Sequence, residues 1–166
     1  MRKQTTLLCA SLLPLMLGAL SAIPQSPSTD VKHTTDIAVV VNADNPVNDV
    51  KLSELRKIVV GEQRTWTSRF PIELILRQDG AQEQVVLLHA LAQTDASQFH
   101  KLWAARVFRG EVSAEPVIVP SSGLATEFVA THRGAVAFVR GTDVRRDLKV
   151  LKIDGLLPGM SGYPLR

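Results

Sequence analysis

From residue 37 onward, short runs of β-branched and aliphatic residues alternate with longer segments in which apolar residues recur at helical spacing. Short apolar runs bounded by Gly, Pro, Asn or Asp are typical of buried strands. We expect strands at Ile37–Val41, Ile72–Leu76, Pro116–Val119, Ala135–Val139 and Val150–Ile153. Strands that alternate with helices form βαβ units, so the pattern predicts an α/β fold with a mostly parallel sheet flanked by helices.

The segments between these strands carry start and stop signals for helices. We expect a first helix that begins at Asp49 and ends at Gly61, and a second helical segment through Val85, Leu88 and Leu91. A third helix is expected to be capped by Thr94 or Asp95 and to end before Gly110. A fourth is expected to be capped by Ser122 and to end at Gly134. Trp103 falls on the apolar face of its helix and is expected in the core, whereas Trp66 is expected to anchor a loop.

The N-terminus has the pattern of an export signal. Arg2 and Lys3 precede an apolar run from Leu7 to Leu20, and small residues follow at Ser21 and Ala22. We therefore expect a signal peptide at residues 1–22, a flexible Pro/Ser/Thr-rich leader at 23–36 and one domain at 37–166. The mature protein is then expected to be periplasmic or secreted.

Cleavage would remove the single cysteine and two basic residues, leaving 17 Lys and Arg against 16 Asp and Glu. The mature chain is thus nearly neutral and can form no disulfide. It has no basic stripe with interleaved aromatic residues, which argues against a nucleic-acid partner. No metal-ligand spacing and no catalytic motif is present, so we expect neither a metal, a cofactor nor an enzyme.

Ligands of α/β sheets bind beyond the carboxyl ends of strands, where helix N-termini converge. Three predicted turns qualify: Asn42–Asn45, Arg77–Gly80 and Ser121–Gly123. In the second, a strand runs through Arg77, Asp79 and Gly80 into a helix, and Glu83 adds a negative charge to its first turn. This turn has the residues to cradle a phosphate or carboxylate.

Each of these features has a structural alternative. Arg77 could be the partner of Asp79, two residues away, and not an anion ligand. Ser122 could be an ordinary helix N-cap, and Asn42 and Asn45 could serve only the geometry of their turn.

Several segments together resemble the periplasmic phosphate-binding proteins of ABC importers, members of the type 2 periplasmic-binding superfamily. The resemblance is carried, in order, by Val39–Asn42 with Asn45–Pro46, by Leu52–Gly61 before Trp66, by Arg77–Gly80, by Gly134–Val139, and by Leu151–Gly155 with Tyr163–Leu165. It covers residues 37–166 and corresponds to one lobe of a protein that has two.

The resemblance implies binding of phosphate or a related small oxyanion for ABC-type uptake or sensing, with Arg77, Asp79, Gly80, Ser121 and Ser122 as ligand residues. It also implies importer membrane subunits or another periplasmic protein as partners. The family's Ser-Gly-Thr after the glycine is replaced here by Ala81-Gln82-Glu83, which removes two hydroxyl donors. The alternative is a non-catalytic periplasmic protein-interaction module that has kept the fold and lost the ligand site.

Overall fold

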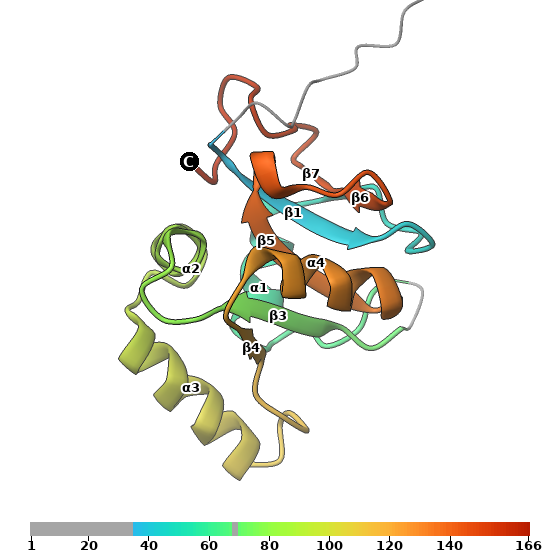
Figure 1. Ribbon diagram of the computed structural model, residues 1–166. Helices are drawn as coiled ribbons and strands as arrows, with labels where there is room; N and C mark the ends of the chain where they lie inside the picture. Colours follow the sequence, from blue (N-terminus) through green and yellow to red (C-terminus); the bar gives the residue numbers. More distant parts are fainter. Residues whose placement is uncertain (1–34, 68–69) are drawn as a thin grey trace, which may run out of the picture.

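The computed structural model describes residues 35–67 and 70–166, and the predicted signal peptide and most of the predicted leader lie outside them. The main sheet has five strands: β1 (Ile37–Asn42), β3 (Glu73–Arg77), β4 (Val117–Val119), β5 (Ala135–Arg140) and β6 (Leu148–Val150). Their order is β4-β3-β5-β1-β6 (Figure 1). Four of the five predicted strands correspond to β1, β3, β4 and β5, and the α/β class is confirmed.

The sheet is mixed, because its two halves differ in strand direction. β3 pairs in parallel with β4 and β5, whereas β1 pairs antiparallel with both β5 and β6. The expected parallel pairing holds for the β4-β3-β5 half and not for β1 and β6. The apolar runs in the sequence predict where strands lie, but they do not indicate the direction in which neighbouring strands pair. The carboxyl ends of β3, β4 and β5 share one edge.

Helices begin and end close to the predicted signals. They are α1 (Leu52–Val59), α2 (Gln82–Leu87) with a π-helical continuation η2 (Leu88–Ala92), α3 (Ala96–Phe108) and α4 (Ser122–Thr131), and a short 3-10 turn η3 spans Gly141–Asp143. Asp95 caps α3 by accepting from the Gln98 backbone N–H at 2.8 Å. Gly61 and Gly110 have φ of +79° and +70°, the left-handed geometry of helix ends.

Two details at the ends of the domain differ from expectation. Asp49 does not open α1, since Asp49–Val50 forms a short strand, β2, that pairs in parallel with β7 (Lys152–Ile153). The predicted strand Val150–Ile153 is correspondingly split between β6 and β7, which belong to different sheets. Both differences result from backbone pairing between residues far apart in the sequence. Neither residue periodicity nor helix-capping signals can predict such pairing.

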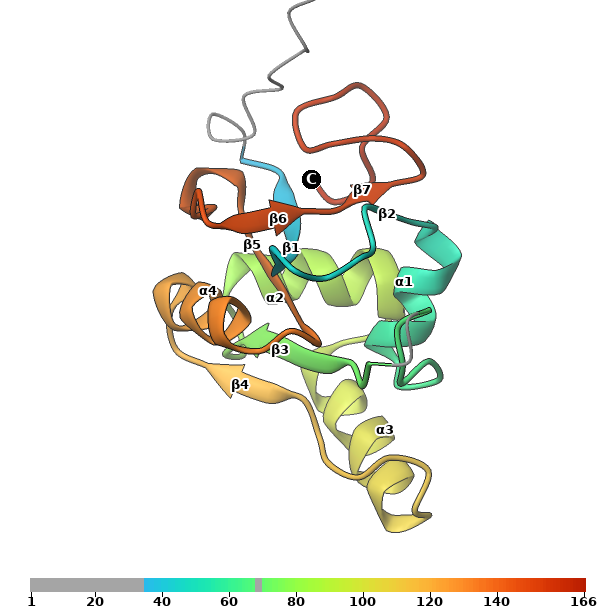
Figure 2. The same cartoon turned by 90° about the vertical axis from the view of Figure 1, so that its right-hand side faces the viewer.

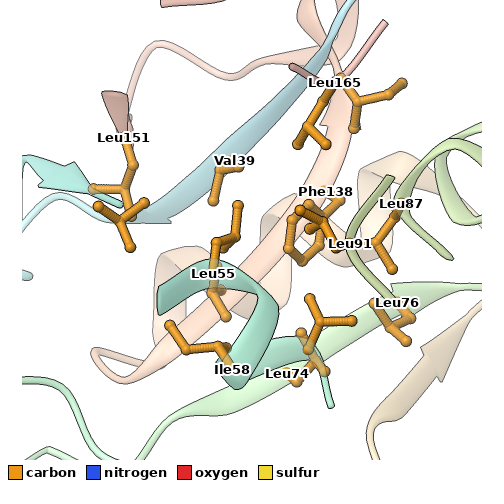
Figure 3. Packing of buried hydrophobic residues seen from close by; sticks show 14 of the residues in the cluster. Val39, Leu55, Ile58, Leu74, Leu76, Leu87, Leu91, Phe138, Leu151 and Leu165 are labelled. Carbon is orange, nitrogen blue, oxygen red and sulfur yellow. The ribbon is translucent and has the colours of Figure 1, made fainter. Parts of the chain in front are cut away.

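Helices cover both faces of the main sheet (Figure 2). On one face, Val39, Leu74, Leu76 and Phe138 pack with residues of α1, α2, η2 and α3 (Figure 3). On the other face, a smaller cluster beneath α4 contains Ala38, Val40, Ile75, Ala137 and Val129. Each fully buried Leu, Ile or Phe stabilises the fold by roughly 1.5–3 kcal/mol, so the larger cluster carries most of the stability.

The two tryptophans occupy the positions that the sequence predicts. Trp66 is buried in the loop between α1 and β3, and its Nε1 donates to the Gly134 carbonyl at 2.9 Å. Trp103 lies on the buried side of α3 and donates to the Val59 carbonyl at 3.1 Å. Among the helices of the described residues, none is both long and apolar enough to cross a membrane.

Candidate functional site

Polar side chains gather where β3, β4 and β5 end. Arg77 is the last residue of β3 and Arg140 the last residue of β5, while Ser121 and Ser122 follow β4 at the start of α4. Because the three strands are parallel neighbours, their ends place these side chains along one edge of the sheet.

Glu83, in the first turn of α2, lies at the centre of this group. Its Oε1 is 3.9 Å from Arg77 Nε and 3.5 Å from Arg140 Nε, and it accepts a hydrogen bond from the Ser122 hydroxyl at 3.3 Å. Only 4% of the Glu83 side chain is exposed. Since α2 and α4 cover opposite faces of the sheet, this carboxylate joins the two helical layers across the strand ends. We refer to Arg77, Glu83, Ser122 and Arg140 as the strand-end cluster.

Arg77 is the most deeply placed cation of the strand-end cluster. Its side chain is 14% exposed, and its Nη1 donates to the Val119 carbonyl at 3.3 Å. Its Nε is buried and has no hydrogen-bond partner among the described residues. Buried donors are nearly always satisfied, so an unpaired guanidinium donor at a strand-end edge is a site where an additional acceptor would be stabilised.

Arg140 is the outer cation. Its side chain is 47% exposed, and besides Glu83 it contacts Asp143 of η3 at 3.5 Å. With Glu83 and Asp143 beside Arg77 and Arg140, two formal positive charges meet two formal negative charges. The group is therefore balanced without any ligand.

Asp79 does not join the strand-end cluster. Its Oδ1 accepts from Gln84 Nε2 at 2.5 Å, and both its oxygens lie 3.2 Å from His100 Nε2 on α3. The hydrogen bond from Gln84 and then that from His100 hold the pKa of the Asp79 carboxyl below its usual value. The structural alternative that paired Arg77 with Asp79 is wrong, because Glu83 supplies the partner of Arg77.

The other predicted ligand residues have local roles that the structure makes visible. Gly80 adopts φ of +82°, and its backbone N–H donates to Gln84 Oε1 at 3.1 Å. Ser121, not Ser122, is the N-cap of α4, and its hydroxyl accepts from the Leu124 N–H at 3.2 Å. Ser122 is thereby free of the capping role and turns its hydroxyl toward Glu83.

The turn Asn42–Asn45 lies at the opposite edge of the sheet, because β1 runs antiparallel to β5. Asn42 Nδ2 donates to the carbonyls of Val129 and Ala130 at 3.0 and 2.8 Å, and so satisfies the C-terminal end of α4. The expectation that this turn shares the ligand edge is wrong, and its asparagines are structural.

Sequence reasoning missed Arg140 and Asp143, and it treated Glu83 only as a neighbouring charge. A signal for Arg140 was present, since it ends a buried run just as Arg77 does. The contacts of Glu83 with the two arginines could not be read from spacing, because they depend on the parallel pairing of β3 with β5.

No group of three or more His, Cys, Asp or Glu side chains in the described part of the chain could hold a metal ion. A cleft of about 820 Å³ opens elsewhere, at the amino ends of β3 and β4. Its lining includes charged residues of both signs, Lys57, Arg64, Glu62 and Glu115, and the apolar Trp103. None of the strand-end cluster lines it.

No model of a known protein family matches the chain. No curated protein matches it either. Several solved structures do match the chain. One is a candidate phosphate ABC transporter substrate-binding protein from Clostridium perfringens, solved with bound phosphate. It is 20% identical, has a TM-score of 0.61, and the match covers 74% of this chain and 46% of that one. An ABC-type phosphate transport receptor from Vibrio cholerae is 17% identical with a TM-score of 0.59, covering 74% and 48%.

A third structure, PstS from Borrelia burgdorferi, is 12% identical with a TM-score of 0.62, covering 78% of this chain and 53% of that one. This chain therefore spans about half the length of the proteins it matches. At these identities the comparisons establish the fold, which is that of part of a phosphate-binding protein of ABC transporters. The matched proteins are named for binding and transport, not for catalysis.

Proposed function

We propose that this chain is an exported, non-catalytic binding domain that recognises a small oxyanion, phosphate foremost, at the carboxyl-end edge of its sheet. The observation that carries the proposal is Arg77, whose buried Nε is 3.9 Å from Glu83 Oε1 but has no hydrogen-bond partner among the described residues, at an edge shared with Arg140 and the Ser122 hydroxyl. Guanidinium groups and hydroxyls are the donors that tetrahedral oxyanions prefer.

The fold supports the same role, because one of the matched structures was solved with phosphate bound. In keeping with those proteins, the domain would deliver or report an anion outside the cytoplasm, with importer membrane subunits or another periplasmic protein as partner. Affinity for phosphate should be modest, since Arg140 is half exposed and water screens its charge.

A second function is favoured by a specific observation: the strand-end cluster together with the neighbouring Asp143 is already neutral, because Glu83 and Asp143 balance both arginines. A domain with this arrangement could keep the fold and act as a protein-interaction module without a free ligand. Binding of phosphate to the wild-type protein separates the two functions.

Isothermal titration of the purified protein with phosphate, sulfate and a phosphonate is the test. Oxyanion recognition predicts phosphate binding at roughly millimolar strength, lost in Arg77→Ala and kept in the matched control Arg145→Ala. Arg145 is a suitable control because it is exposed and pairs with Asp147 away from the strand-end cluster. Absence of both heat and thermal shift at millimolar phosphate would rule out the oxyanion function and leave the interaction module.

A further inference from the structure

We propose that Glu83 limits the affinity of this edge for anions: its carboxylate takes the contacts with Arg77, Arg140 and Ser122 that an external oxyanion would need, and so competes with that oxyanion. The inference deepens the proposed function by naming the residue that sets its strength. It begins from geometry, since one carboxylate oxygen is within 4 Å of both arginine Nε atoms and accepts from the Ser122 hydroxyl.

The contacts of Glu83 are those that an oxyanion would make. A single oxygen atom, Glu83 Oε1, is contacted by two guanidinium groups from the adjacent parallel strands β3 and β5 and by one hydroxyl from α4. The contacts measure 3.3, 3.5 and 3.9 Å, all longer than the 2.7–2.9 Å of a well-formed charge-assisted hydrogen bond. The carboxylate thus neutralises the cations without saturating their donors, and Arg77 Nε keeps no hydrogen-bond partner among the described residues.

Covalent attachment gives this internal carboxylate an advantage over a free anion. Glu83 lies in the first turn of α2 and its side chain is 4% exposed, so it is held beside Arg77 at a high effective concentration. A phosphate ion must displace it or share the cations with it, and sharing places like charges side by side. The residue at position 83 therefore decides how open the edge is to an external anion.

Replacing Glu83 by a small hydroxyl residue should open the site. Glu83→Ser removes the charge and adds a hydroxyl donor at the second residue of α2. Glu83→Gln keeps the size of the side chain and removes only the charge. The glutamine variant guards against misfolding, because it leaves no cavity and its amide oxygen can still accept from the Ser122 hydroxyl.

The experiment titrates phosphate and sulfate, at matched ionic strength, into the protein expressed from the full-length sequence. Its variants are Glu83→Ser, Glu83→Gln, the double variant Arg77→Ala with Glu83→Ser, and the control Glu115→Gln. Glu115 is exposed in the loop before β4, away from the strand-end cluster. Circular dichroism verifies that each variant is folded.

We expect Glu83→Ser to bind phosphate at least tenfold more tightly than the wild type. If the wild type gives no heat, the dissociation constant of Glu83→Ser should lie at least tenfold below the highest phosphate concentration tested. Glu83→Gln should gain affinity in the same direction, Glu115→Gln should leave it unchanged, and the added Arg77→Ala should abolish the gain. Equal affinity of wild type and both folded Glu83 variants would overturn the inference. A silent wild type with a binding Glu83→Ser would instead refute only the proposed function.

Discussion

At the residue scale, the buried contact between Arg77 and Glu83 determines the state of the strand-end edge. Both side chains are largely buried, at 14% and 4% exposed, whereas Arg140 is 47% exposed. Screening by water weakens an exposed partner far more than a buried one, even though the Arg140 distance is slightly shorter. Glu83 should therefore depend on Arg77 more than on Arg140.

A pair of double-mutant cycles measures this difference. Alanine cycles should give a coupling free energy of about 1–3 kcal/mol for Arg77 with Glu83, and below about 1 kcal/mol for Arg140 with Glu83. Urea unfolding of the single and double variants provides the values. A larger coupling free energy with Glu83 for Arg140 than for Arg77 would mean that burial does not determine which of the two contacts is stronger.

The Asp79 carboxylate predicts a dependence of stability on acid pH. Its pKa in the folded protein is lowered, first by the Gln84 hydrogen bond and then by that of His100. A carboxyl group with a lowered folded pKa stabilises the fold above its unfolded pKa of about 3.9 and loses that contribution as pH falls through the folded value. Because Asp79 is half exposed, the effect should be small.

NMR titration of the Asp79 side-chain carbon checks this account. Gln84→Ala should raise the Asp79 pKa, since the hydrogen bond from Gln84 is the largest single cause of the lowered value, and His100→Ala should raise it as well. An Asp79 pKa that is unmoved in Gln84→Ala would show that this hydrogen bond is not made in solution.

At the scale of elements, the sequence predicted the strands and most helix ends but not how the strands are directed. Asp95, Gly61 and Gly110 act where local signals place them, because caps and left-handed turns depend on neighbouring residues. The direction of β1 and the split between β6 and β7 depend on partners far along the chain. For the same reason Arg77 and Ser122 could be proposed from sequence, while the central place of Glu83 and the contribution of Arg140 could not.

Gly134, at the turn into β5, is required by the close approach of two backbone segments. A Cβ atom added there would lie 2.0 Å from the Pro71 carbonyl oxygen, and the Gly134 carbonyl also accepts from Trp66. Gly134→Ala should destabilise the domain by about 1–3 kcal/mol or more, because backbone must move to relieve the clash. Urea unfolding tests it, with Gly123→Ala, which meets only a side-chain oxygen at 3.8 Å, as the matched control. Equal midpoints for the two variants would contradict the role of Gly134.

At the scale of the whole molecule, the C-terminal tail closes the fold against β1. The buried Tyr163 hydroxyl donates to the Ile37 carbonyl at 2.8 Å, and the Ile37 N–H donates to the Leu165 carbonyl at 2.8 Å. Burial, and then the charge of Asp36, raise the pKa of Tyr163 well above its usual value. A group with a raised folded pKa stabilises fully below its unfolded pKa, about 10, and this contribution is lost as pH rises above it.

Tyr163→Phe should therefore lower stability at pH 7 by about 0.5–1.5 kcal/mol, the net value of a typical hydrogen bond. The variant should also lose less stability than the wild type as the pH rises above about 10, because it has no Tyr163 hydroxyl to ionise. Urea unfolding at pH 7 and between pH 9 and 11 measures both effects. A variant as stable as the wild type at pH 7 would mean that the hydrogen bond of the Tyr163 hydroxyl does not stabilise the tail.

Oxyanion recognition at the strand ends is the central claim for the molecule as a whole, and an NMR titration tests its location directly. Phosphate added to the ¹⁵N-labelled protein should shift the resonances of Arg77, Glu83, Ser122 and Arg140 in a saturable way, and those of Asn42 and Asn45 at the opposite edge should stay in place. No saturable shift, or shifts centred on the cleft around Lys57 and Trp103, would contradict it.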